Sequence, residues 1–186
     1  ELRAIRNDAA VLDMSPLAKY NISGVDAERF TNYVITRDAS KIEIGQAYYT
    51  PWCDREGKVV SDGIVFRMGE DAFRITGDPS HDWLMQHVDG FDVELDDATH
   101  DYGILSLQGP KSRAVLETAT ADDWSSFPFS RVRMAKIGGV DVEVARQGFT
   151  GEHGYELCIA ASDAGPMWDA LMDAGNDHGI RPAGWF

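Results

Sequence analysis

Two short segments of the chain combine carboxylates with aromatic residues and glycines, a mixture typical of small-molecule sites. Residues 48–63 include Asp62, and residues 147–156 end at Glu156. A partly desolvated carboxylate can move a proton near neutral pH, and aromatic rings offer flat faces to a planar ligand. These two segments are therefore the candidate functional regions of the sequence.

Glu156 lies in the strand-like segment Tyr155–Ile159, where alternation places Glu156 and Cys158 on one sheet face. One interpretation is that Glu156 simply faces water, as most glutamates do. The other is that it lines an aromatic pocket, where a ligand edge with paired N–H donors, such as that of a pterin, offsets its desolvation. Tyr49, Trp52 and Phe149 would then supply the ring faces.

Asp62 lies in a second strand-like run, Val59–Phe66, where alternation places it on the same face as Ile64 and opposite Ser61. Aspartate is a poor strand former, so its place here needs a reason. Either it caps a bulge beside Gly63, or it is a partly desolvated group suited to proton transfer.

Other chemistries find little support in the sequence. It has no dinucleotide-type or Walker-type glycine loop, its five histidines lack metal-ligand spacing, and Ser61 is not framed as a hydrolase nucleophile. The 17 basic and 31 acidic residues give a net charge of −14, which argues against nucleic-acid and anionic-membrane partners. Without a secretory signal, Cys53 and Cys158 are expected to be reduced thiols in the cytoplasm.

The apolar patterning predicts an α+β fold of two similar units, each ordered strand–helix–three strands–helix–strand, with mostly antiparallel sheets and helices on one face. The predicted strands are Lys19–Ser23, Gln46–Trp52, Val59–Arg67, Ala72–Thr76, Phe91–Leu95, Gly103–Leu107, Arg131–Ile137, Val140–Ala145 and Tyr155–Ile159. The predicted helices begin at Asp26, at Asp78-Pro79, at Pro110 and at Ser162.

A series of short strings follows the same chain, at residues 2–15, 25–30, 35–38, 107–112, 148–156 and 179–184. The most specific are Leu-Gln-Gly-Pro at 107–110 and Gly-Phe-Thr-Gly-Glu at 148–152. In this order they resemble the folate-binding region of the glycine-cleavage T-protein (aminomethyltransferase) superfamily. That superfamily also includes the folate domains of sarcosine- and dimethylglycine-oxidising enzymes and tetrahydrofolate-dependent demethylases.

The resemblance implies that tetrahydrofolate is bound and receives a one-carbon unit from a small-molecule donor, with a lipoyl carrier protein as a partner. It assigns folate binding to Tyr49, Phe149 and Glu156, and to Asp78 where the family has an asparagine. It assigns catalysis to Asp62.

One departure from the family pattern bears on the reaction. Ser61 stands where the T-protein string Gly-Gly-x-x-Asp-Asp has its first aspartate. That departure points toward the oxidase branch, toward demethylation of a methoxy, methylamine or sulfonium donor, or toward a folate-binding protein without catalysis.

The resemblance also implies a domain arrangement. Residues 16–100 are expected to form an inserted second domain, and residues 1–15 plus 101–186 a discontinuous first domain. A third, barrel-type domain is expected to begin after Phe186.

Overall fold

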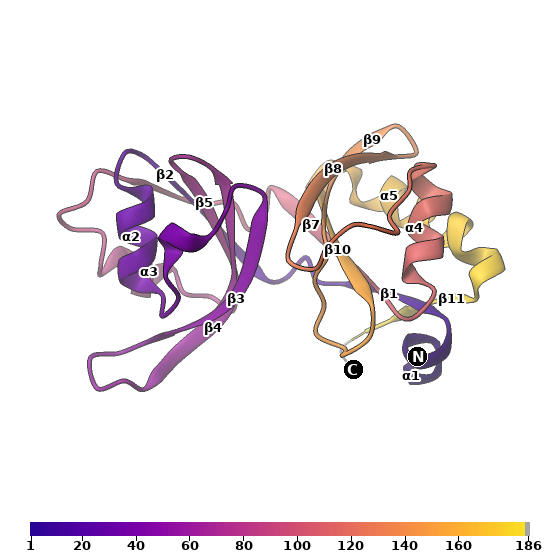
Figure 1. The fold of residues 1–186 in the computed structure, drawn as a ribbon, viewed down its shortest axis with the longest axis horizontal. Helices are drawn as coiled ribbons and strands as arrows, with labels where there is room; N and C mark the ends of the chain where they lie inside the picture. The colour runs from indigo at the N-terminus through magenta and orange to yellow at the C-terminus, as the bar shows by residue number, and fades with distance from the viewer. Residues whose placement is uncertain (185–186) are drawn as a thin grey trace. The chain divides into compact units, whose positions relative to one another are not determined.

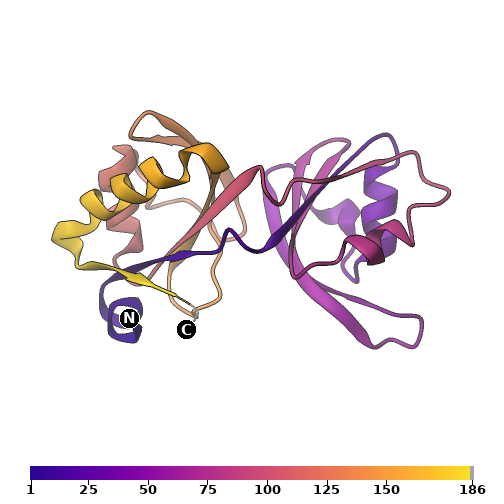
Figure 2. The same ribbon diagram turned by 180° about the vertical axis from the view of Figure 1, so that it is seen from behind.

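The chain divides into two compact units, each a sheet with helices against one of its faces (Figures 1 and 2). The computed structural model describes residues 1–184. The segment Pro16–His100 forms one unit, here called the inserted unit. The other, the split unit, joins Glu1–Ser15 to the residues from Asp101 onward.

The inserted unit is a five-stranded antiparallel sheet in the order β3-β4-β5-β2-β6. Its elements are β2 (Ala18–Ser23), α2 (Ala27–Val34), a 3-10 turn (Ala39–Lys41), β3 (Gln46–Cys53), β4 (Val59–Gly69), β5 (Ala72–Gly77), α3 (His81–Met85) and β6 (Glu94–Asp97). Both helices pack on the same sheet face, over a core that includes Tyr20, Ile22, Phe30, Trp52, Val65, Phe73, Ile75 and Leu84.

The split unit is a six-stranded sheet, within the described residues, in the order β11-β1-β7-β10-β9-β8. Its elements are α1 (Leu2–Asn7), β1 (Ala9–Asp13), β7 (Tyr102–Gln108), α4 (Ser112–Thr120), β8 (Val132–Ile137), β9 (Val140–Ala145), β10 (Gly154–Ala160), α5 (Ala164–Gly175) and β11 (Ile180–Ala183), with 3-10 turns at Ala161–Asp163 and Asn176–His178. The core under α4 and α5 includes Val11, Leu107, Val115, Leu116, Val144, Tyr155, Leu157, Met167 and Leu171.

The two sheets share one strand order, with a single addition. In the inserted unit, β6 pairs directly with β2 and runs antiparallel to it. In the split unit, β1 lies between the corresponding strands β7 and β11, antiparallel to β7 and parallel to β11. The predicted α+β class and the repeated element order are therefore confirmed. Because β1 is parallel to β11, the sheet of the split unit is mixed.

Several predicted boundaries were wrong. The helices expected to begin at Pro110 and Ser162 begin at Ser112 and Ala164. Two further differences have a local cause. The helix expected to begin at Asp78-Pro79 begins at His81, because residues 78–80 form a turn in which Ser80 Oγ donates to the Asp78 carbonyl and Ser80 N–H donates to the Tyr20 hydroxyl. The strand expected at Phe91–Leu95 begins at Glu94, because the Phe91 N–H closes a turn onto the Val88 carbonyl.

The β8–β9 hairpin forms where the sequence predicts it. Gly138 and Gly139 have φ angles of 57° and 86°, the left-handed pair that a two-residue hairpin turn requires. Among residues 1–184, no helix has the length and apolar character needed to cross a membrane.

Candidate functional site

Glu156 lies on the face of the split unit's sheet that α4 and α5 do not cover. Its Cα partners across the sheet are Ser106 on β7 and Ala145 on β9. Its chain neighbours Tyr155 and Leu157 are fully buried in the core on the helix side. The predicted alternation is therefore confirmed, and Glu156 projects away from the helices.

The carboxylate of Glu156 is largely enclosed but has no protein donor. Among residues 1–184, no hydrogen bond or ion pair reaches it. Burial raises the pKa of Glu156 to about 7, because desolvation disfavours the charged form and no cation restores it. Near neutral pH this group can therefore either accept or release a proton.

The loop at residues 147–153 is fastened over the same sheet face by Gln108, whose side chain is fully buried. The Gln108 amide nitrogen donates to Ser106 Oγ at 3.0 Å and to the Gln147 carbonyl at 3.3 Å. The Thr150 hydroxyl donates to Gln108 Oε1 at 2.9 Å. Because Gln108 pairs with Gly154 across the sheet, two positions from Glu156, the loop lies on the Glu156 side.

Two glycines allow this close contact. A Cβ atom on Gly148 or on Gly154 would lie 2.3 Å from the Gln108 amide, so a larger residue at either position would force that amide to shift. Phe149 follows Gly148 directly, and its side chain is 49% exposed. The structure thus brings the loop that carries Phe149 to the face of Glu156, and Gln108, which the sequence analysis did not single out, joins the 107–110 and 148–152 strings.

Further contacts hold the second half of the loop, at Thr150, Glu152 and His153. Arg6 pairs with the Glu152 carboxylate at 2.7 Å and donates to the Thr150 carbonyl at 3.2 Å. The Gly109 N–H and the Ser112 hydroxyl both donate to the His153 carbonyl, at 2.8 and 3.1 Å. The loop is therefore tied at both ends.

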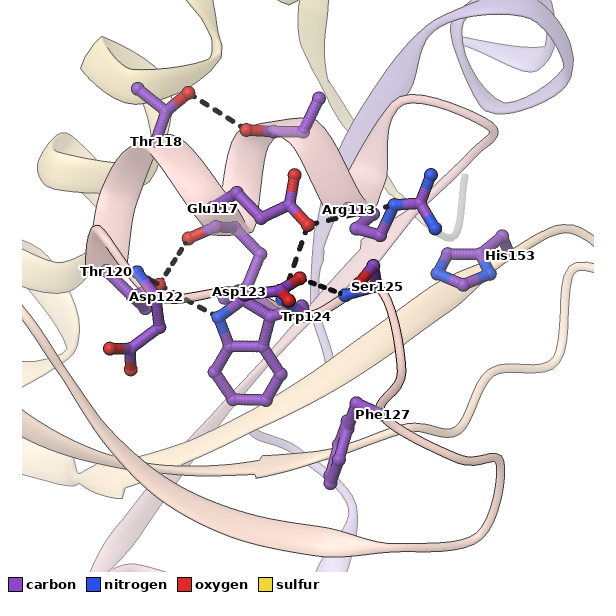
Figure 3. Close-up of polar contacts among 12 residues, drawn as sticks. Arg113, Glu117, Thr118, Thr120, Asp122, Asp123, Trp124, Ser125, Phe127 and His153 are labelled. Atoms are coloured by element: carbon purple, nitrogen blue, oxygen red, sulfur yellow. Dashed lines mark hydrogen bonds and ion pairs between the residues drawn. The ribbon is translucent and has the colours of Figure 1, made fainter.

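Behind β10, on the helix side, a second group of polar contacts surrounds Trp124 (Figure 3). Trp124 Nε1–H donates to Thr120 Oγ1 at 2.9 Å, and the Trp124 N–H donates to Glu117 Oε1 at 3.3 Å. The two hydrogen bonds of Trp124 attach the segment that follows α4 to the last turns of that helix. Nearby, burial and the charges of Arg146 and Arg113 lower the pKa of His153.

In the inserted unit, Tyr49 and Asp62 lie together on the face that α2 and α3 do not cover. Tyr49 pairs with Ile64 and Asp62 with Pro51 in the β3–β4 ladder, so both side chains share that face. The Tyr49 hydroxyl donates a short hydrogen bond to Asp62 Oδ2, which raises the pKa of Tyr49. The predicted alternation along β4 is confirmed.

Ser61 and Asp78 are placed differently. Ser61 pairs with the buried Trp52 and so points to the helix-covered face. Asp78 is exposed and lines an open pocket of about 380 Å³ with Val60 and Ser61. No hydrogen bond within residues 1–184 joins the Asp78 carboxylate to Tyr49 or Asp62. The roles assigned to all five predicted site residues remain predictions.

The whole chain, residues 1–186, matches the model of the GCVT N-terminal domain. It belongs to that family. The resemblance drawn from the sequence strings is thereby confirmed. The crystal structure of the glycine cleavage system aminomethyltransferase T from Bartonella henselae superposes with a TM-score of 0.85 at 23% identity, over 98% of this chain and 49% of that one. This likeness confirms the fold.

Curated relatives of this GCVT domain are enzymes. An aminomethyltransferase from Saccharopolyspora erythraea is 34% identical over 189 residues, covering 99% of this chain and 52% of that protein. A trimethylamine-oxide aldolase from Ruegeria pomeroyi is 36% identical over 196 residues, covering 99% and 25%. The chain therefore spans about half the length of the aminomethyltransferases that it matches.

Proposed function

We propose that the protein carrying this chain binds tetrahydrofolate and transfers a one-carbon unit from a small-molecule amine donor onto it, with this chain supplying the folate-binding surface. The observation that carries the proposal is Glu156, an enclosed carboxylate with a pKa of about 7 and no donor among the described residues. The aminomethyltransferase relatives supply the reaction class.

The residues present fit the ligand. A pterin edge carries an amino group and a ring N–H side by side, which match the two oxygens of one carboxylate. Glu156 would hold this edge, and the exposed ring of Phe149 would contact the flat face. When bound, tetrahydrofolate supplies the nitrogen that accepts the one-carbon unit.

Asp62 is proposed to hold the proton that must move during transfer. Its Oδ2 atom accepts from the Tyr49 hydroxyl, which orients the carboxylate and leaves Oδ1 for the reacting groups. Tyr49 stays protonated because the same hydrogen bond raises its pKa. Asp62 would thus act as a general base at Oδ1.

A second candidate is tetrahydrofolate-dependent demethylation of a methylamine, methoxy or sulfonium donor. Ser61 favours it, because Asp62 then works without a neighbouring aspartate and the Ser61 side chain faces the helix side of the sheet. The aldolase relative is consistent with chemistry on methylated amines. Under the first candidate, a lipoyl carrier protein would deliver the donor. Under the second, no carrier is needed.

Calorimetric titration of the full-length protein with tetrahydrofolate tests the shared claim. Saturable binding is expected, and a protein that is folded by circular dichroism yet gives no heat would overturn it. Turnover assays then separate the candidates. Product from an aminomethyl-loaded lipoyl carrier supports transfer, and product from sarcosine or a methoxylated aromatic supports demethylation. Folate binding without any product would indicate a non-catalytic folate-binding protein.

A further inference from the structure

Gln108 is a fully buried polar side chain on the helix-free face of the split unit's sheet. It contacts both strand β7 and the loop at residues 147–153. We propose that Gln108 is a positioning residue of the folate site, whose amide fixes the 147–154 loop over the face of Glu156 and thereby places the ring of Phe149 against the ligand. The ligand half of this inference rests on the proposed function. The loop half stands on the contacts of the chain itself.

Only a carboxamide satisfies the contacts at position 108. Both N–H groups of Gln108 are used, toward Ser106 Oγ and the Gln147 carbonyl, and its oxygen accepts from Thr150. A glutamate would lack both donors when ionised, and a methionine would lack donors and acceptor alike. In a fully buried setting each unmade bond costs the desolvation of its partner.

The loop at residues 147–153 lies close against the Gln108 amide. Gly148 and Gly154 approach Gln108 so closely that a methyl group at either position would displace its amide. The distance of the loop from the sheet is therefore set by the Gln108 side chain. Phe149 follows directly after the first of these contacts, so we expect a side chain of different shape at position 108 to displace its backbone.

Gln108 is also connected to Glu156, through Ser106. Ser106 lies two residues before Gln108 on β7, on the same face, and is the Cα partner of Glu156. Because Ser106 Oγ accepts from Gln108, its own hydroxyl hydrogen is left for another acceptor on that face. One amide thus orients both the loop that carries Phe149 and the hydroxyl beside Glu156.

The test uses the full-length protein with Gln108→Glu, Gln108→Met and, as a matched control, Gln86→Glu at an exposed glutamine of the inserted unit. Hydrogen exchange of the 147–153 amides and tetrahydrofolate affinity are measured from pH 5 to pH 8, each against wild type at the same pH. Melting temperatures are recorded for every variant.

For Gln108→Glu we expect loop protection and folate affinity each to fall about tenfold at pH 8, where the new carboxylate is ionised and repels the Gln147 carbonyl. Near pH 5 the protonated acid again accepts from Thr150 and donates one hydrogen bond, so both should return to within about threefold of wild type. Gln108→Met should show the loss at every pH. Gln86→Glu should show none. A role confined to overall stability would lower the melting temperature without lowering the folate affinity of the folded protein.

Two results would overturn the inference: loop protection unchanged in Gln108→Met, or loop protection lost with folate affinity kept within twofold. If the Gln108 variants do not fold, Thr150→Val removes one bond of the same amide from the partly exposed loop side, and it should weaken both readouts in the same direction by about threefold. A wild-type protein that binds no folate overturns the proposed function and the ligand half of the inference, while the exchange measurement still decides the loop half.

Discussion

The helix-free face of each sheet carries charged side chains, and two of them, Lys19 and Glu156, are treated in opposite ways. Lys19 in the inserted unit is fully buried, and its ammonium donates to the carbonyls of Leu17 at 2.9 Å and Thr99 at 3.2 Å. Glu156 in the split unit has no donor at all among the described residues. One charge is satisfied by its own chain and the other is not.

The difference separates a structural charge from a functional one. A buried ion is tolerated when hydrogen bonds replace its lost hydration, as they do at Lys19. An enclosed carboxylate without such bonds stays costly unless a ligand supplies them, which is why its pKa rises. Asp62 is intermediate, with one donor from Tyr49. Substitutions at these three positions should therefore fail in three different ways.

The largest effect is expected at Asp62. In the full-length enzyme, Asp62→Asn should reduce turnover by about 10²–10⁴-fold, because the amide cannot take up a proton, while tetrahydrofolate affinity stays within about threefold. Steady-state kinetics and calorimetry give the two numbers. Turnover at the wild-type rate would show that Asp62 only caps the strand beside Gly63.

Glu156→Gln should chiefly weaken ligand binding. Replacing one carboxylate oxygen by an amide donor sets donor against donor at the pterin edge and should cost about 1.5–3 kcal/mol, or roughly ten- to a hundredfold in affinity. Glu94→Gln, at an exposed strand position of β6, is the matched control and should bind normally. Affinity within twofold of wild type would make Glu156 a plain strand residue.

Lys19→Met should act on stability instead. The substitution leaves the carbonyls of Leu17 and Thr99 without their buried donor, at a cost of about 1–3 kcal/mol in the free energy of unfolding. Urea unfolding of this variant, compared with Lys58→Met at an exposed turn, measures the effect. If Lys19→Met is as stable as wild type while Glu156→Gln is less stable, the contrast between a structural charge at Lys19 and a functional charge at Glu156 is wrong.

The last expected effect is a pH dependence of stability. Because the pKa of Glu156 is raised from 4.5 to about 7, the folded protein binds this proton more tightly than the unfolded chain. Its contribution to stability is therefore fully present below about pH 4.5 and is lost as the pH rises through about 7. Relative to wild type, Glu156→Gln should become more stable by about 2–3 kcal/mol between pH 5 and pH 8. A difference that stays constant with pH would contradict the raised pKa.

Alternation along single strands was predictable because it depends on a two-residue period. It placed Asp62 beside Ile64 and Glu156 beside Cys158 on the correct faces. The repeated element order was predictable for the same reason, since apolar periods and glycine or proline signals are local. The string resemblance was also sufficient to recognise the family.

What the sequence did not reveal depends on contacts between distant residues. The role of Gln108 follows from the approach of Gly148 and Gly154, 40 and 46 positions away, which no local pattern encodes. The pairing of β1 with β7 and β11 is equally nonlocal. The late start of α3 reflects a hydrogen bond from Ser80 to Tyr20, which competes with the local helix signal.

The strand β1 has a consequence for the order in which the chain folds during synthesis. The inserted unit is one continuous segment, so it can form as soon as residues 16–100 have emerged from the ribosome. The split unit must wait, because Ala9–Leu12 need Ile180–Ala183 as their parallel neighbours. Until then β1 is an edge strand separated from its last partner by the whole intervening chain, and closing so long a loop is slow. Early synthesis therefore exposes β1 to pairing with other nascent chains, and chaperone dependence should be concentrated in the split unit.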